Sequence, residues 1–333
     1  MSTLITKLDK IRNGAYEPSD FIIADAKDGD MAMGIVAPGP KRDASGKPKD
    51  TSNSLQEYLA AMEEMTKSGL VDIMLMSASN AETLSKRGLF ADGKVTPAVR
   101  HNDTTDIWSM RGSSYNKEPS QNFRSANLER VRAFSNLGLY SITFSNDLNC
   151  DLETLEAYGE YRDEVVDLGL DHFLEVFNPA FDIGISGEGL CDYINDCILK
   201  TLAGLVSAER PQFLKMQYNG PKAMEQLAAY DPTGLIVGIL GGAKGTTRDT
   251  FELISQAEKY GARVALFGRK INLAEDPIAL VGLMRQVVER TVMPLDAVNA
   301  YHDQLAKSGK VADRDIEADR EITNAILKVN RDA

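Results

Sequence analysis

The sequence predicts an α/β protein that folds as a single-domain (β/α)8 barrel, the TIM-barrel architecture. Short apolar runs of β type alternate with amphipathic helical segments along most of the 333 residues, and eight such runs are present. The chain is longer than the ~250 residues typical of such barrels, which indicates extended loops. The alternative is a doubly wound open sheet, but that fold usually carries a glycine-rich turn after its first strand, and none follows the first run here.

Each predicted strand is a short run rich in aliphatic and aromatic residues. The eight runs are Phe21–Ala26, Val71–Ser77, Val95–Val99, Leu139–Phe144, His172–Phe177, Gln212–Gln217, Leu235–Leu240 and Arg263–Phe267. Helical periodicity is clearest between them in Ser54–Ser68, Leu152–Leu168, Leu190–Ala208, Arg248–Tyr260 and Pro277–Arg290.

Three long segments follow predicted strand ends: Gly29–Asp50, His101–Ser125 and Asn178–Gly189. They fall on the side of the barrel where active sites form, so we expect them to act as lids or to contact another subunit. The barrel is predicted to span residues 1–310. Residues 311–333 are predicted to form a charged helical tail that packs on the barrel or on a partner subunit of a homo-oligomer.

Composition narrows the class of protein. Hydrophobic residues make up 43% of the chain, which favours a large core. The net charge of −12 disfavours nucleic acid and anionic membranes as partners. No apolar run approaches the ~18 residues of a membrane helix, and the first residues do not resemble a signal peptide, so we expect a cytoplasmic protein.

Metal and cofactor motifs are scarce. The three cysteines lack metal-binding spacing and are expected to be reduced structural thiols. The three histidines are scattered, so a zinc site is not predicted, although carboxylate-bound magnesium stays open. No cofactor is expected.

Lys215 is the strongest candidate for a catalytic residue. It lies inside the apolar run Gln212–Gln217, where burial of an ammonium is costly. Desolvation lowers the pKa of an amine and leaves free base that can attack a carbonyl. The structural alternative is a lysine at the strand end that reaches water. Three other lysines, Lys27, Lys244 and Lys270, lie in segments that look like polar loops, so we expect them to stay protonated.

Glu175 is a second charge inside an apolar run, on the strand before that of Lys215. If both side chains point into the barrel, they form a pair suited to proton transfer during Schiff-base chemistry; a buried structural salt bridge is the alternative. Asp25, at the end of the first strand, is expected to orient the lysine or bind substrate hydroxyls. Arg100, at the end of the third, suits an anion.

Glycine-containing turns follow the last two strands. Gly241 and Gly242 follow the seventh, and Gly268 and Arg269 follow the eighth. Glycines let backbone N–H groups approach an anion, and barrels often hold a phosphate between these two loops. The pattern predicts a phosphate site; plain turns are the alternative.

The region Gln212–Asp276, above all LIVGILGGAK at Leu235–Lys244 and the segment Gly261–Arg269, resembles class I aldolases. The similar types are the archaeal-type fructose-bisphosphate, tagatose-bisphosphate and deoxyribose-phosphate aldolases. The resemblance implies a (β/α)8 barrel with a Schiff-base lysine on strand six, here Lys215, and a phosphate held after strands seven and eight. It implies a strand-five acid/base at Glu175 and an early aspartate at either Asp25 or Asp28.

The chain departs from the archaeal type, since it lacks the Asp-His-Gly pattern on strand one and a matching tyrosine proton donor, and its His101–Ser125 loop is enlarged. We therefore predict a metal-independent class I aldolase, a lyase acting on a phosphorylated ketose, with the proton donor left open. The alternatives are a transaldolase-like transferase, a phosphosugar isomerase, or a non-catalytic sugar-phosphate-binding barrel.

Overall fold

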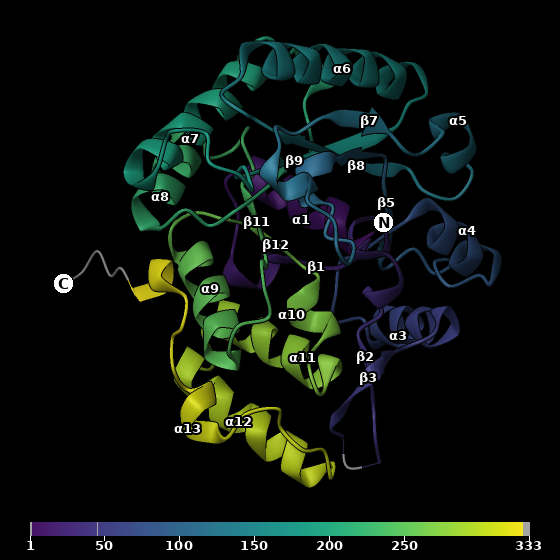
Figure 1. Cartoon of the computed structure of the whole chain (residues 1–333), viewed down its shortest axis with the longest axis vertical. Coiled ribbons are helices and arrows are strands. Elements are labelled where there is room, and N and C mark those ends of the chain that lie inside the picture. The colour runs from purple at the N-terminus through teal and green to yellow at the C-terminus, as the bar shows by residue number, and fades with distance from the viewer. Residues whose placement is uncertain (1, 45, 329–333) are drawn as a thin grey trace.

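The computed structural model describes residues 2–44 and 46–328, in which eight parallel strands close into a barrel (Figure 1). The predicted fold class is confirmed. Each barrel strand overlaps one of the eight predicted runs. The strands are β1 (Ile22–Lys27), β4 (Ile73–Met76), β5 (Thr96–Arg100), β8 (Leu137–Thr143), β9 (Asp171–Phe177), β10 (Leu214–Met216), β11 (Gly238–Leu240) and β12 (Val264–Phe267).

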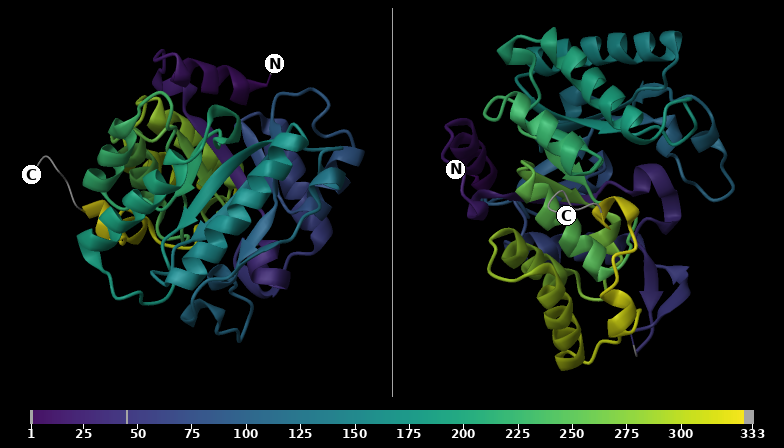
Figure 2. Two further views of the ribbon diagram at one scale, coloured as in Figure 1. Left: turned by 90° about the horizontal axis from the view of Figure 1, so that it is seen from above. Right: turned by 90° about the vertical axis from the view of Figure 1, so that its left-hand side faces the viewer.

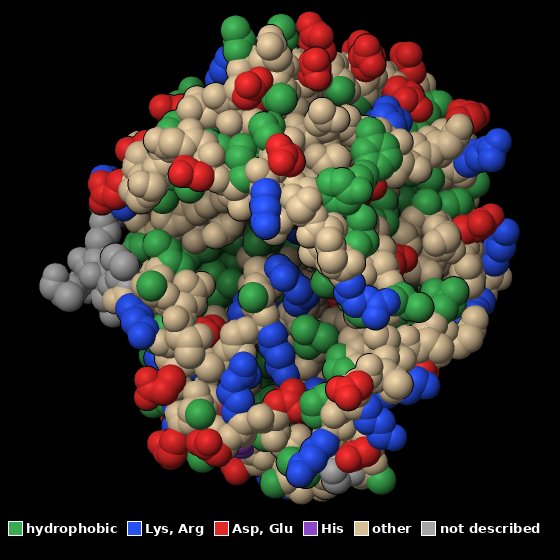
Figure 3. Space-filling view, viewed as in Figure 1, with side chains coloured by type: hydrophobic (Ala, Val, Ile, Leu, Met, Phe, Trp, Pro, Cys, Tyr) green, Lys and Arg blue, Asp and Glu red, His purple; other side chains and the backbone are tan. Residues whose placement is uncertain are grey.

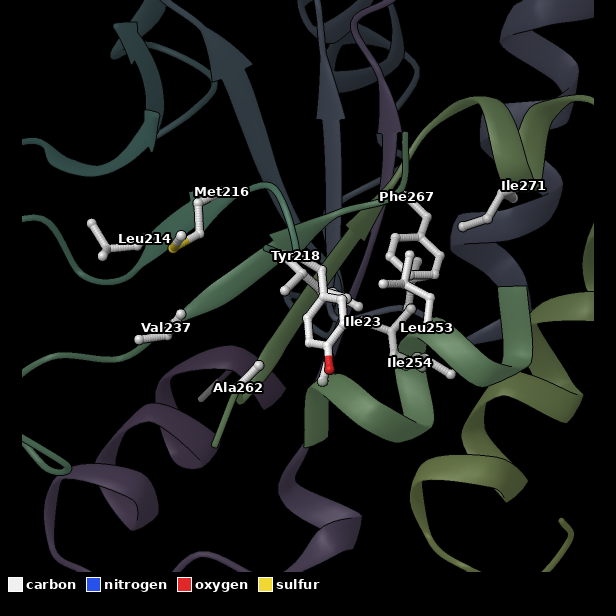
Figure 4. Packing of buried hydrophobic residues seen from close by; sticks show 14 of the residues in the cluster. Ile23, Leu214, Met216, Tyr218, Val237, Leu253, Ile254, Ala262, Phe267 and Ile271 are labelled. Carbon is white, nitrogen blue, oxygen red and sulfur yellow. The ribbon is translucent and has the colours of Figure 1, made fainter. Parts of the chain in front are cut away.

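The buried side chains divide into two clusters, because successive strand residues point to opposite faces. Leu214 and Met216 of β10 belong to the outer cluster, which packs against the surrounding helices (Figure 4). Phe213 belongs to the inner cluster inside the barrel. The same alternation turns Lys215, between Leu214 and Met216, toward the inside.

Helix α1 (Thr3–Arg12) covers the N-terminal end of the barrel. Ser2 caps it by accepting a hydrogen bond from the backbone of Ile5. Its apolar stripe, Leu4, Leu8 and Ile11, is buried in the inner cluster with residues from the strands. The N-terminal end of the barrel is therefore filled with packed apolar side chains, and the polar side chains that could take part in a reaction lie toward the other end.

The remaining helices surround the barrel (Figure 2). All five predicted helices are present, with ends that differ by a few residues: α3 (Leu55–Ser68), α6 (Leu148–Asp167), α7 (Gly187–Ala203), α9 (Thr247–Lys259) and α11 (Pro277–Val288). Further helices lie outside the segments of clearest periodicity: α1, α4 (Ala78–Lys86), α5 (Leu128–Val131), α8 (Pro221–Tyr230) and α12 (Pro294–Lys307). Two one-turn helices, α2 (Asp30–Met33) and α10 (Arg269–Asn272), follow β1 and β12. No helix within residues 2–44 and 46–328 combines the length and apolarity needed to cross a membrane.

Two small hairpins lie in segments that were expected to be loops. β2 (Pro40–Arg42) pairs with β3 (Pro48–Ser52) after β1, and β6 (Asn102–Thr104) pairs with β7 (Asn122–Arg124) after β5. The tip of the second hairpin is held by edge-to-face contacts of Trp108 with Tyr115 and Phe123, at 5.3 and 5.4 Å between ring centroids.

The C-terminal segment from residue 311 to 328 lies along the barrel and contains only short helical turns, α13 (Ile316–Asp319) and the 3-10 turn Ala325–Lys328. Asp249 of α9 accepts hydrogen bonds from the backbone of Thr323 and Asn324. Within the described residues the segment therefore forms short turns and is not one continuous helix. Residues 329–333, the end of the predicted tail, lie outside the described residues.

Candidate active site

Lys215 and Glu175 form an ion pair inside the barrel. Their residues pair directly in the register of β10 and β9, so both side chains leave the sheet on its inner face. Lys215 Nζ lies 2.6 Å from Glu175 Oε1, and the two residues are 5% and 1% exposed. A proton can pass between these atoms without help from water.

The second oxygen of Glu175 is fixed by two further residues of the inner wall. Ser141, which pairs with Glu175 in the register of β8 and β9, donates a hydrogen bond of 2.7 Å to Oε2. Arg100 Nη1 lies 3.6 Å from the same oxygen. The Glu175 carboxylate is therefore held in one orientation, with Oε1 toward Lys215.

Arg100 is surrounded by carboxylates. Besides Glu175, it lies 2.9 Å from Asp28 Oδ2 and 3.4 Å from Asp103 Oδ1. Burial opposes ionisation of Asp28, but the positive charges of Lys215 and Arg100 outweigh it and hold the pKa of Asp28 below its usual value. This environment differs from the expected one: the charge of Arg100 is already compensated by protein groups, which favours a role in positioning Glu175 and Asp28 over direct binding of a phosphate.

Asp25 does not lie at this site, contrary to expectation. Phe21 and Ile23 belong to the outer cluster, and Asp25 continues their side of β1. It lies 3.0 Å from Lys27 Nζ and lines a cavity of about 250 Å³ outside the barrel, together with residues of α3 and α11. Asp28 is the strand-one carboxylate that faces Lys215, which resolves the alternative left open by the sequence.

The pair formed by Asp25 and Lys27 is nevertheless deeply buried. Burial raises the pKa of Asp25, and the charge of Lys27 opposes this shift only in part. Apart from the ammonium group of Lys27, no described donor lies within hydrogen-bond distance of either oxygen of Asp25. A buried charge inside an apolar strand is thus not sufficient to identify a catalytic group, since β1 carries two charges on its outer face.

The predicted phosphate loops are neighbours at the barrel mouth. β11 and β12 pair up to Leu240 and Leu266, so the turns that follow them start side by side. A Cβ added to Gly268 would lie 2.7 Å from the carbonyl oxygen of Ala26, so only glycine allows β12 to end this close to β1. Gly242 has a φ of +67°, a left-handed conformation that favours glycine.

Two cationic side chains follow Gly268. Arg269 is exposed and forms no ion pair or side-chain hydrogen bond with any other described residue, and partial desolvation lowers its pKa. Lys270 is buried, donates a 3.1 Å hydrogen bond to the Lys244 carbonyl, and has a pKa lowered by burial to about 8. Lys and Arg side chains gather over α10, beside a hollow near the middle of the face in Figure 3. This region therefore offers uncompensated positive charge.

The expectation that the competing lysines stay in water is wrong for two of them. Lys27 is 2% exposed and Lys270 is 5% exposed, as deeply buried as Lys215. What distinguishes Lys215 is its position inside the barrel and its contact with Glu175. Lys244 is the one that remains partly exposed, and it pairs with Asp313 of the C-terminal segment at 2.6 Å.

Sequence reasoning singled out neither Ser141, which contacts Glu175, nor Asp103, which contacts Arg100, nor the buried Asp106. The two aspartates lie in the enlarged loop after β5, which has no periodicity to indicate where it enters the barrel. In the described part of the chain, no group of three or more His, Cys, Asp or Glu is arranged to hold a metal ion. The cysteines lie on the outer helices α6 and α7, away from the inner wall.

Solved structures share this architecture. The fold matches that of the archaeal fructose-bisphosphate aldolases. A crystal structure of an archaeal fructose 1,6-bisphosphate aldolase superposes with a TM-score of 0.61, at 14% identity, over 86% of this chain and 99% of that one. In a related structure, with a TM-score of 0.59 and 16% identity over the same shares, the catalytic lysine is covalently bound to the carbinolamine intermediate of the substrate. A fructose-bisphosphate aldolase from Slackia heliotrinireducens gives a TM-score of 0.61 at 12% identity, over 91% and 90% of the two chains.

One curated relative matches in sequence. The 3-hydroxy-5-phosphonooxypentane-2,4-dione thiolase of Salmonella paratyphi A is 29% identical over 140 residues, which cover 42% of this chain. The match spans 45% of that protein's length. No family model matches the sequence. The resemblance to class I aldolases that the residues suggested is confirmed for the fold.

Proposed function

We propose that this protein is a class I aldolase that cleaves or forms a C–C bond in a phosphorylated ketose through a Schiff base on Lys215. The observation that carries the proposal is the ion pair of Lys215 with Glu175 on the inner wall of an aldolase-type barrel. A buried amine beside a carboxylate that is held by Ser141 and Arg100 has what imine formation requires: a nucleophile and a proton carrier in contact.

In the proposed reaction Lys215 transfers a proton to Glu175 and attacks the ketone carbon. Glu175 then returns the proton to the carbinolamine hydroxyl, which leaves as water and yields an iminium. Cleavage of the adjacent C–C bond sends its electron pair into the iminium to form an enamine. The charges of Asp28 and Arg100 keep the buried site close to neutral while these protons move.

The phosphate of the substrate is assigned to the loops after β11 and β12. Gly241, Gly242 and Gly268 give backbone access, and Arg269 supplies a guanidinium that no described carboxylate compensates. These loops follow β11, which is the neighbour of β10, and β12, which is the next strand, so a phosphorylated substrate bound there brings its carbonyl group toward Lys215.

Reductive trapping tests the proposal. A panel of phosphorylated ketoses is assayed for release of dihydroxyacetone phosphate or glyceraldehyde phosphate, and each reaction is treated with borohydride. We expect a stable adduct on the peptide that carries Lys215, and we expect Lys215→Met to lose trapping and turnover while it keeps the fold. The same peptide map reports Lys27, Lys244 and Lys270 as internal controls. Turnover without an adduct on any lysine would exclude the Schiff-base mechanism.

A second candidate activity is thiolytic cleavage of a phosphorylated dione, favoured by the printed name of the Salmonella relative. In that reaction the acyl fragment passes to an external thiol such as coenzyme A. Both candidates need a phosphate site and an activated carbonyl. Acyl-thioester formation from a phosphorylated 2,4-dione, with no aldehyde released from ketoses, would select the thiolytic activity.

A further inference from the structure

The loop after β5 places a carboxylate above the catalytic pair. After the β6 strand, the turn Thr105–Ile107 returns Asp106 to the barrel, where it is 1% exposed. Its Oδ1 accepts hydrogen bonds from Ser120 at 2.7 Å and from Thr143 at 3.1 Å. Ser120 belongs to the same loop, whereas Thr143 belongs to the barrel wall.

Thr143 locates Asp106 relative to Lys215. It lies two residues beyond Ser141 on β8, on the same inner face, because Tyr140 before Ser141 and Ile142 between the two belong to the outer cluster. Two residues along a strand correspond to about 6.6 Å. Since Ser141 is bonded to Glu175, Asp106 lies about one side-chain layer nearer the mouth than the pair of Glu175 with Lys215.

The second oxygen of Asp106 has no partner. Within residues 2–44 and 46–328, Oδ2 is buried and accepts no hydrogen bond, and no Lys or Arg forms an ion pair with this carboxylate. Burial raises the pKa of Asp106, against the hydroxyl groups of Ser120, Thr143 and Thr104 and the backbone N–H of Asp106, which lower it. An unsatisfied buried carboxylate oxygen costs free energy unless a ligand supplies a donor.

Because Glu175 is already engaged, a different residue can act as the second base. Both of its oxygens are already in use, one toward Lys215 and the other toward Ser141 and Arg100. Imine formation happens at these atoms. Cleavage requires removal of a proton from a hydroxyl farther along the substrate, on the carbon that becomes the aldehyde.

We propose that Asp106 is a catalytic base that binds and deprotonates this hydroxyl, an inference that rests on the proposed aldolase function. The O–H proton moves to Asp106 Oδ2, the C–O bond becomes a carbonyl, and the electrons of the broken C–C bond pass into the iminium on Lys215. In the synthetic direction the protonated Asp106 returns the proton to the new alkoxide. The enlarged loop would thus supply the group that the archaeal tyrosine pattern lacks in this chain.

Asp106→Asn separates imine formation from cleavage. Dihydroxyacetone phosphate has no hydroxyl beyond the bond that breaks, so borohydride trapping of this probe on Lys215 should be as efficient in the variant as in the wild type. The kcat for cleavage of the best ketose bisphosphate of the panel should fall by about 10²–10⁴-fold, with KM changed by less than about tenfold. Normal cleavage by Asp106→Asn, with trapping intact, would refute the role of Asp106.

Two further outcomes keep the proposals apart. If the wild-type protein is not trapped, the aldolase proposal fails independently of Asp106.

Asp151→Asn is the matched control. Asp151 accepts a 2.6 Å hydrogen bond from the backbone of Ser145, and Ser145 Oγ accepts one from the backbone of Ser120, which lies in the same loop as Asp106. We expect Asp151→Asn to retain kcat within about twofold. Equal losses of kcat in both variants, with equal loss of thermal stability, would make Asp106 a purely structural anchor of the loop and overturn the inference.

Discussion

Lys270 allows a quantitative test of the buried positive charge at the predicted phosphate site. Burial lowers its pKa from 10.5 to about 8, with opposing contributions from Asp249 and Arg269. Such a difference between the folded and unfolded chains corresponds to about 3 kcal/mol of lost stability at pH 7. The perturbation is Lys270→Met, which removes the titrating group and keeps a side chain of similar length.

The direction of the pH effect on stability depends on whether the folded or the unfolded chain binds the proton of Lys270 more tightly. The unfolded chain retains the proton on Lys270 up to a higher pH than the folded one, so the penalty is fully present below pH 8 and disappears as the pH rises toward 10.5. Between pH 7 and pH 9.5, the free energy of unfolding of the wild type should therefore rise by about 2 kcal/mol relative to that of Lys270→Met. Urea unfolding of both proteins at the two pH values measures this difference, and contributions that do not depend on pH cancel.

Lys270→Arg is the matched control, because its guanidinium stays charged throughout this pH range. Relative to the wild type, the free energy of unfolding of Lys270→Arg should fall by the same ~2 kcal/mol as the pH rises. The same change is expected in both variants, although the Arg side chain is charged and the Met side chain is uncharged. If the free energies of unfolding of wild type and both variants change in parallel with pH, Lys270 does not titrate in this window and the reasoning from burial fails.

Two other predictions concern catalysis. Glu175→Gln keeps the size of the side chain but cannot carry a proton, so kcat should fall by about 10²–10⁴-fold with little change in KM; steady-state kinetics checks this, and a near-normal kcat would assign proton transfer to another group. Arg269→Ala removes a guanidinium that no described carboxylate neutralises, so KM for the phosphorylated substrate should rise by about 10–100-fold, while the slow reaction of the unphosphorylated ketose should not change. Equal effects on both substrates would mean that Arg269 does not contact the phosphate.

The barrel strands were predictable because each is an apolar run bounded by turn residues, and eight in succession leave few arrangements. The hairpin strands Pro40–Arg42 and Pro48–Ser52 were not, because both are polar and lack alternation. Glu175 and Lys215 could be paired from sequence, since adjacent parallel strands align similar positions. This pairing needed only the strand assignment and a common inner face.

The error at Asp25 has a simple physical origin. Side chains on a strand alternate between two faces, so the inner or outer position of a residue depends on the parity of its number. The sequence did not reveal which face of the first strand points into the barrel, and Asp25 and Asp28 have opposite parity. The burial of Lys270 was equally hidden, because it results from the packing of α10 against loops distant in sequence.

Helix α1 determines by which end of the barrel a molecule can enter and leave. Leu4, Leu8 and Ile11 fill the N-terminal end together with the inner cluster, so a molecule that reaches Lys215 enters and leaves by the same opening. In the proposed cleavage, the fragment bound to Lys215 would lie deeper in the barrel than the fragment released near Asp106. Depth would then set the order of product release in the proposed reaction: the free aldehyde would depart first, and water for hydrolysis of the remaining imine would arrive by the same path.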